Sequence, residues 1–269
     1  MQAHTKTIIL CLFPFILKAQ ISQSLVLGGQ ISAIGRASVA VQGSPEALWH
    51  NPANVRGIKG MTAILSSEWR YGAKDFRPIA VGYILPTASS VMGFQAQYFG
   101  FSGVYDSRIS VTYARPFSEK IDVGVHLKYQ YLRLRDIGGQ SNIGFDIGFN
   151  MLIINNLRMG FYAENPIPFR RNPHDIPPSL FHLGFSYIVN QNVLISSEIV
   201  KDIAYPTALR FGMEYKPSPT LYLRCGFETL PTTFAFGLGY AFSEKIKMDM
   251  SLSHHAVLGA TPALSLIFK

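Results

Sequence analysis

Most of this chain alternates between apolar residues and polar or glycine residues with a period of two. The segment from Asn142 to Met151 shows the pattern most clearly, because Ile, Phe and Met occupy its odd positions and Asn, Gly and Asp its even positions. Successive side chains of a β-strand point to opposite faces, so a period of two predicts strands with one apolar and one polar face. Such segments recur from about residue 60 to the end of the sequence.

About fourteen segments of this kind can be placed, and we expect the connections between them to be alternately short and long. The expected strands lie near residues 61–70, 77–86, 90–100, 107–115, 121–132, 141–152, 156–164, 180–189, 193–200, 206–216, 220–228, 233–242, 245–253 and 261–268. An even strand number, with short turns at one end and longer loops at the other, is typical of bacterial outer-membrane barrels.

The composition agrees with a barrel in lipid. The chain is 48% hydrophobic and only 15% charged, yet after its N-terminal segment no stretch offers 18 uninterrupted apolar residues. A barrel spreads its lipid-facing residues over many strands and leaves no open edge in the membrane. The sequence therefore predicts an all-β, transmembrane antiparallel β-barrel of about 14 strands in the cell outer membrane, in contact with outer-membrane lipids.

The first 60 residues do not alternate. Lys6, the apolar run 8–17 and the cleavage-like Leu17-Lys18-Ala19 predict a secretory signal peptide over residues 1–19. Residues 20–60 are rich in glycine and alanine, and we expect them to form an N-terminal plug (hatch) segment. The barrel itself is expected over residues 61–269.

The polar face of the expected strands carries glycines and charges of both signs. Inward glycines would let other backbone approach the wall closely, and mixed charge in a confined interior predicts internal ion pairs. The inward glycines are Gly82, Gly93, Gly124, Gly144, Gly148, Gly160, Gly184, Gly212, Gly226, Gly237 and Gly239. The inward ionisable residues are Asp122, His126, Lys128, Asp146, Arg158, Glu164, Glu198, Arg210, Glu214, Lys216, Arg224, Glu228 and Asp249.

The sequence offers no convincing catalytic, cofactor-binding or metal site. His254 and His255 are adjacent, so on a strand they would point to opposite faces and could hardly bind one ion. Serine, histidine and aspartate are frequent, but no set of them predicts an enzyme. The basic residues are scattered, with Arg170-Arg171 among the densest spots, which argues against a nucleic-acid partner.

Two short motifs in residues 20–60 carry a family resemblance. The first is a Gly-x-Ala-x-x-Ala stretch formed by Gly35, Ala37 and Ala40, and the second is Trp49-His50-Asn51-Pro52-Ala53. An Asn before Pro is restricted to extended or turn geometry, so the second motif predicts a sharp bend, with Trp49 packed against the inner wall. Together the motifs resemble the N-terminal signature of FadL-like outer-membrane proteins, and most closely the PorV/PorQ branch of Bacteroidota.

The resemblance implies a fourteen-stranded barrel plugged by a hatch that contains the Asn-Pro-Ala box. It also implies a non-enzymatic accessory of type IX secretion or cell-surface attachment that binds partner proteins. The alternative is a FadL-like transporter or channel for small hydrophobic molecules, and a third possibility is a structural barrel with no dedicated ligand. Within the long proline-rich connection 165–179, a candidate partner loop contains Pro168, Arg170, Arg171 and Pro173. This loop could also fold inward as a constriction or simply cap the barrel.

Overall fold

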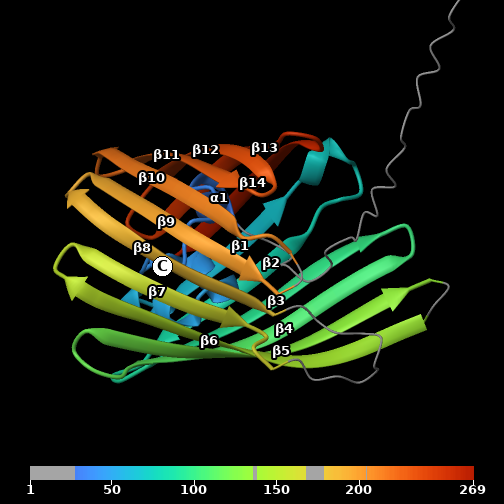
Figure 1. Ribbon diagram of the computed structural model, residues 1–269, viewed down its shortest axis with the longest axis horizontal. Coiled ribbons are helices and arrows are strands. Elements are labelled where there is room, and N and C mark those ends of the chain that lie inside the picture. The colour runs from blue at the N-terminus through green and yellow to red at the C-terminus, as the bar shows by residue number, and fades with distance from the viewer. Residues whose placement is uncertain (1–27, 136–137, 168–178, 204) are drawn as a thin grey trace, which may run out of the picture.

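The computed structural model describes residues 28–135, 138–167, 179–203 and 205–269, and within them the predicted alternating segments form one closed barrel (Figure 1). Fourteen strands make up its wall. They are β1 (Thr62–Glu68), β2 (Ile79–Pro86), β3 (Val91–Phe101), β4 (Val104–Pro116), β5 (Ile121–Leu134), β6 (Gly138–Ile154), β7 (Leu157–Glu164), β8 (Leu180–Asn190), β9 (Val193–Asp202), β10 (Ala208–Ser218), β11 (Leu221–Thr229), β12 (Thr232–Ala241), β13 (Ile246–His255) and β14 (Gly259–Phe268).

The wall is continuous around the barrel. Every strand pairs antiparallel with its sequence neighbours, and β1 closes the ring by pairing with β14, where Ile64 lies opposite Ile267. A closed sheet satisfies the backbone hydrogen bonds of each strand from its two neighbours, which a wall in lipid requires. No helix in the described part of the chain is long and apolar enough to cross a membrane.

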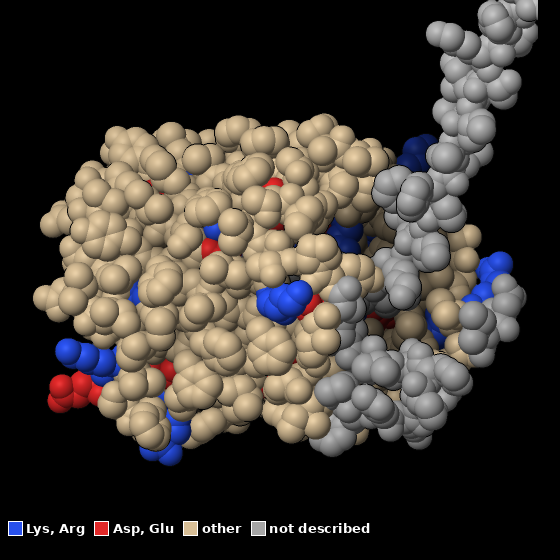
Figure 2. Space-filling model, in the orientation of Figure 1, with Lys and Arg blue, Asp and Glu red and all other residues tan. Residues whose placement is uncertain are grey.

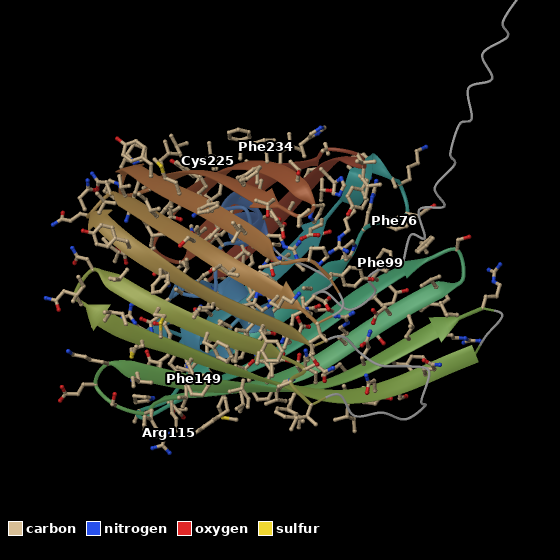
Figure 3. The ribbon with its side chains drawn as sticks, viewed as in Figure 1. Phe76, Phe99, Arg115, Phe149, Cys225 and Phe234 are labelled. Atoms are coloured by element: carbon tan, nitrogen blue, oxygen red, sulfur yellow. The ribbon has the colours of Figure 1, made fainter. Side chains whose placement is uncertain are left out.

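The side-chain phase predicted from the alternation is confirmed. On β5 and β6 the apolar side chains of Leu127, Ile143 and Phe149 are 60%, 56% and 40% exposed, whereas Asp146 and Asn150 are buried inside the barrel. Figure 2 shows that the wall in view is mostly free of charged atoms, and Figure 3 shows Phe149 and Phe234 on its outer surface. An apolar outer face and a polar inner face place the barrel in the outer membrane.

The predicted alternation of short and long connections is only partly right. Residues 101–106 and 133–140 were expected to be loops, but β3 and β4 are joined by Ser102 and Gly103 alone, and β5 and β6 run to Leu134 and from Gly138. Ser102 and Gly103 both have positive φ, at 38° and 94°, which permits the tight turn.

The two ends of the barrel still differ. The longest connections, 69–78 and 165–179, leave the same end, which we call the loop end; the first of them contains the 3₁₀-helix η3 (Arg70–Gly72). At the opposite end, which we call the turn end, every connection spans two to four residues, and β1 begins and β14 ends there.

Residues 28–58, here called the inner segment, lie inside the barrel near the turn end (Figure 1). They form helix α1 (Gly29–Ala33) and the 3₁₀-helices η1 (Pro45–Trp49) and η2 (Pro52–Gly57). Leu48 and Trp49 pack with Ile64, Ile84 and Ile267 of the wall in one apolar cluster. Each such buried side chain contributes roughly 1.5–3 kcal/mol, so this cluster holds the inner segment firmly against β1, β2 and β14.

The lipid-facing phase leads to a stability prediction. Leu127 lies in the middle of the apolar band, opposite Val111 and Phe145. We expect Leu127→Arg to lower the free energy of unfolding in lipid vesicles by about 2–4 kcal/mol, because a guanidinium near the bilayer midplane lacks water. Ile246→Arg, at the first residue of β13, is the matched control and should cost less than about 1 kcal/mol. Equal costs in a denaturant titration would mean that β5 does not cross the membrane.

Candidate functional site

The Asn-Pro-Ala box forms the corner between η1 and η2. Asn51 is fully buried and caps η2, since its Oδ1 accepts a hydrogen bond from the backbone N–H of Ala53 at 3.1 Å. Its Nδ2 donates to the carbonyl oxygens of Val39 at 2.7 Å and of Phe149 at 3.1 Å. Asn51 thus joins three parts of the structure: the corner itself, the first half of the inner segment and strand β6.

The Gly-x-Ala-x-x-Ala stretch runs directly along the wall. Gly35 has φ of +60° and its backbone N–H lies so close to Gly226 of β11 that a Cβ on either residue would meet backbone atoms of the other chain segment. Ala37 and Ala40 are each only 1% exposed. The carbonyl oxygen of Ala40 accepts hydrogen bonds from Asn150 Nδ2 at 3.2 Å and Ser186 Oγ at 2.9 Å.

Glu46 of η1 binds both the beginning of the inner segment and strand β14. Its carboxylate accepts hydrogen bonds from the backbone N–H groups of Gln30 at 3.1 Å and Ile31 at 2.8 Å, and from Ser265 Oγ of β14 at 2.6 Å. Full burial and the nearby carboxylate of Asp249 raise the pKa of Glu46 to about 7, although the three donors act in the opposite direction. This carboxylate therefore links the inner segment to the wall in a proton-dependent way.

Glu198 of β9 is a wall residue whose carboxylate binds the backbone of the inner segment. Its Oε2 accepts from the backbone N–H groups of Ser38 at 2.9 Å and Val39 at 2.8 Å. Its Oε1 lies 2.8 Å from His182 Nδ1 and 2.9 Å from Arg210 Nη1. A buried carboxylate with this many donors stays in place, and so do the two peptide groups that it binds.

The sequence alone does not single out these two carboxylates as anchors. It marks Glu198 only as one of many inward charges. Glu46 is the one acidic residue between positions 20 and 60, and an isolated carboxylate in a segment of small and apolar residues is the signal that could have found it.

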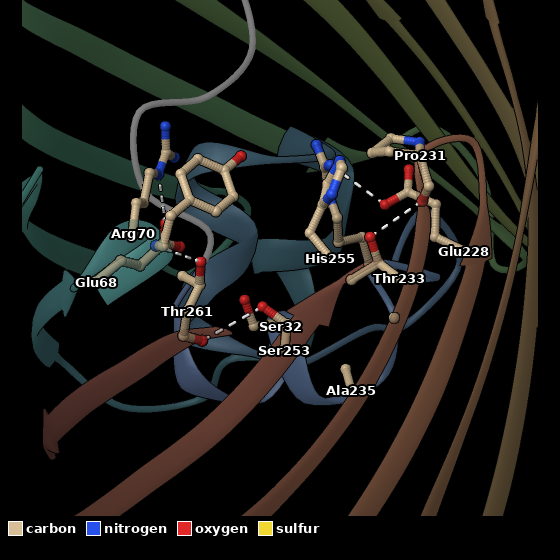
Figure 4. A pocket seen from close by; sticks show the side chains of 13 residues that line it. Ser32, Glu68, Arg70, Glu228, Pro231, Thr233, Ala235, Ser253, His255 and Thr261 are labelled. Atoms are coloured by element: carbon tan, nitrogen blue, oxygen red, sulfur yellow. Dashed lines mark hydrogen bonds and ion pairs between the residues drawn. The ribbon is translucent and has the colours of Figure 1, made fainter. Parts of the chain in front are cut away.

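A polar pocket of about 110 Å³ lies on the loop-end side of the inner segment. Figure 4 shows Glu68 and Arg70 on one side of this pocket and Glu228 with Pro231 on the other. The pocket is bounded by ion pairs, since Arg70 Nε lies 3.0 Å from Glu68 and Arg36 Nη1 of the inner segment lies 3.3 Å from Glu228.

A second cavity, of about 250 Å³, adjoins the first and shares Glu228 and Pro231 with it. Its wall includes Leu180, Val200 and Ala208, which form a small apolar cluster at the loop ends of β8, β9 and β10. The loop half of the barrel thus contains apolar and charged linings side by side, with the inner segment beneath them.

The internal ion pairs predicted from the inward charges are confirmed. Beyond those already described, Asp146 Oδ1 lies 2.7 Å from Lys128 Nζ. Further pairs join Lys128 to Glu164, His126 to Asp146, Arg210 to Glu228, Arg224 to both Glu214 and Asp249, and Asp122 to Arg56. These pairs brace the wall from within, because they join adjacent strands, connect β5 to β7 and β11 to β13, and, through Arg56, tie β5 to the inner segment.

The remaining candidate residues do not gather into one site. His255 lines the polar pocket, whereas His254 does not. In residues 28–135, 138–167, 179–203 and 205–269, no group of three His, Cys, Asp or Glu side chains could hold a metal ion. The candidate partner loop with Pro168, Arg170, Arg171 and Pro173 lies outside the described residues, as does the expected signal peptide.

Comparison with known proteins identifies the fold. No family model and no curated protein sequence matches the chain. Among solved structures, the CymD monoaromatic hydrocarbon channel aligns with a TM-score of 0.69 and 13% identity over 91% of this chain and 97% of the channel. The Ralstonia pickettii toluene transporter TbuX aligns with a TM-score of 0.69 and 14% identity over 91% and 97%. A Pseudomonas aeruginosa FadL homologue aligns with a TM-score of 0.65 and 10% identity over 92% and 98%.

These neighbours share the architecture of a single closed barrel across almost their whole length. The chain therefore has the fold of FadL-like outer-membrane channels, as the resemblance of its N-terminal motifs implied. Identities of 10–14% show the fold alone. The narrower assignment to the PorV/PorQ branch stays a prediction.

The raised pKa of Glu46 predicts that docking of the inner segment depends on pH. The carboxyl has a pKa of about 7 when the inner segment is docked and 4.5 when it is not. Its protonation therefore makes its full contribution to the free energy of docking below pH 4.5, and this contribution is lost as the pH rises through 7. We expect amide exchange at Gln30 and Ile31, corrected for its intrinsic pH dependence, to be faster at pH 8 than at pH 5, by a free energy of at most about 3 kcal/mol. Glu46→Gln should remove this pH step, and the exposed Glu119→Gln should keep it. An unchanged step in Glu46→Gln would contradict the assignment.

Proposed function

We propose that this barrel is a non-enzymatic outer-membrane channel for small hydrophobic or amphipathic molecules, closed in the described conformation by the inner segment as a plug. The observation that carries the proposal is the whole-length alignment with barrels that are named hydrocarbon channels and toluene transporters. This alignment supports the transport hypothesis better than the secretion accessory that the N-terminal motifs favoured.

The loop end offers a first contact for an apolar solute. Phe76, Phe99 and Phe101 form an aromatic cluster there, with ring centroids 4.4 Å apart for Phe76 and Phe101 and 5.5 Å for the other two pairs. Phe99 also packs against the apolar cluster that contains Leu48, and Figure 3 shows Phe76 and Phe99 close to each other at this end. Aromatic faces bind apolar molecules with little loss of side-chain entropy, which suits a collecting surface.

Passage beyond the loop half requires the inner segment to move. The cavity of about 110 Å³ ends on Ser32, Gly35 and Arg36 of the inner segment. The adjoining cavity of about 250 Å³ is lined by wall and loop residues, and the wall beside both is fully paired. Displacement would break the hydrogen bonds to Glu46 and Glu198, so these carboxylates would set how readily the channel opens.

A second candidate function is a partner-binding barrel of the PorV/PorQ type, in secretion or surface attachment. Two observations favour it: the continuous wall offers no lateral exit, and many buried contacts hold the inner segment in place. In this case the filled barrel would be a rigid platform, and protein partners would bind its loop end.

Uptake measurements separate the two functions. In asymmetric vesicles with lipopolysaccharide outside, we expect the intact protein to give saturable uptake of a fluorescent monoaromatic probe. Phe76→Ala should reduce uptake several-fold, because it removes a collecting side chain without touching the inner segment. Phe234→Ala is the matched control and should leave uptake unchanged, because Phe234 lies on the outer face of the barrel and is 52% exposed.

Absence of uptake by the correctly folded protein would contradict the proposed transport function. If a defined partner is then retained through gentle detergent extraction, the partner-binding function takes its place.

A further inference from the structure

Two turns at the turn end repeat the same five-residue sequence and the same conformation. Residues 117–121 and 242–246 both read Phe-Ser-Glu-Lys-Ile. In both, the N–H groups of the Phe and the Ser donate to the carbonyl oxygen of the Ile, at 2.8 and 3.1 Å in the first copy and at 2.9 and 3.3 Å in the second. In both, the Ser hydroxyl accepts from the N–H of the Lys, at 3.4 and 3.2 Å.

Each turn exposes its phenylalanine just beyond the apolar belt. Phe117 is 76% exposed and Phe242 is 59% exposed. Phe242 stacks edge-on against Tyr240, two residues earlier on the outer face of β12, with centroids 5.0 Å apart. Aromatic side chains at this depth lie among lipid headgroups.

The first copy of the turn borders a large groove on the outer surface. The groove measures about 680 Å³ and runs between this turn and the end of β6. Ile121, Met151 and Ile153 of its lining are apolar and form its floor, while Ser118, Glu119 and Lys120 of the turn supply its polar lining. The Leu152 N–H donates to the Lys120 carbonyl oxygen at 2.8 Å, which fixes the turn against β6.

The first copy also carries a basic residue at a position where the other copy has an aromatic one. Arg115 stands two residues before Phe117, where the second copy has Tyr240 before Phe242. Arg115 is exposed and lies opposite Val123, which shares the outer face of β5 with the groove residue Ile121. Figure 3 shows Arg115 pointing away from the barrel.

These two cations are available for a ligand. Neither Arg115 nor Lys120 forms an ion pair within the described part of the chain, and Glu119 is the one acidic residue of the turn. A guanidinium and an ammonium above an apolar floor match a phosphate above acyl chains. Short turns of such barrels face the periplasm, where the leaflet consists of phospholipid.

From this arrangement we propose that Arg115, Lys120 and the groove floored by Ile121, Met151 and Ile153 form a binding site for an anionic glycerophospholipid of the periplasmic leaflet. The phosphate lies between the two basic side chains, one acyl chain follows the groove, and Phe117 inserts beside the headgroup. This site is independent of any transport through the barrel.

The repeated turn supplies its own control for a test. Phe117→Trp and Phe242→Trp each place an indole at the same position of an identical turn, in a Trp69→Phe background where the remaining Trp49 is buried. The background also carries Lys269→Gln, because the Lys269 N–H donates to the Lys245 carbonyl oxygen and its side chain would add a cation beside the second turn. The full-length variants are reconstituted in phosphatidylcholine vesicles, and quenching is titrated with brominated phosphatidylglycerol and with brominated phosphatidylcholine.

We expect half-maximal quenching by phosphatidylglycerol at a roughly fivefold lower mole fraction for Phe117→Trp than for Phe242→Trp, since one more basic side chain acts at the surface. Brominated phosphatidylcholine should quench both indoles alike. Adding Arg115→Gln and Lys120→Gln should abolish the preference, while Lys245→Gln should leave it in place. Equal quenching of the two indoles by phosphatidylglycerol, or a preference that survives Arg115→Gln with Lys120→Gln, would overturn the proposal.

Discussion

Direct contact between the backbone of the inner segment and the backbone of the wall is the constraint on which this structure depends. At Gly124, Gly160 and Gly226 a Cβ atom would collide with backbone atoms of the inner segment. A side chain at any of these positions would force the inner segment and the wall to shift apart. The absence of a Cβ is therefore what lets wall side chains such as Asn150 and Glu198 reach the peptide groups of the inner segment.

The close contact divides the interior into two halves with different properties. In the turn half, the inner segment fills the barrel and its peptide groups find partners on the wall. In the loop half, charged residues such as Arg210 and Glu228, which form an ion pair, line small cavities. Removing one member of a buried pair typically costs about 3–5 kcal/mol, so these charges specify one arrangement of strands and inner segment. Passage of a solute through the barrel would therefore begin in the loop half and would require the inner segment to move.

Sequence periodicity predicted the wall well because strand phase is a local property. The alternation between Asp146 and Phe149 is enough to decide which side faces lipid. Connection lengths were less predictable: Ser102 and Gly103 resemble loop residues, yet they make a two-residue turn because both accept positive φ. Of the two anchoring carboxylates, Glu46 stands out as an isolated acidic residue, whereas the role of Glu198 could not be predicted, since it binds the N–H of Ser38 across 160 positions of sequence. Such a pair exists only once the barrel has closed.

A matched pair of glycine substitutions tests the close contact most directly. Gly226 and Gly144 both face inward, but a Cβ at Gly226 would meet the backbone of Ile34 and Gly35, whereas one at Gly144 would find only side-chain atoms, at 3.4 and 3.9 Å. Hydrogen exchange of residues 28–58 in the reconstituted protein is the measurement. The account predicts that Gly226→Ala accelerates exchange throughout this segment while the barrel strands stay protected, and that Gly144→Ala leaves exchange as in the wild type. Equal protection of the inner segment in the two variants would contradict it.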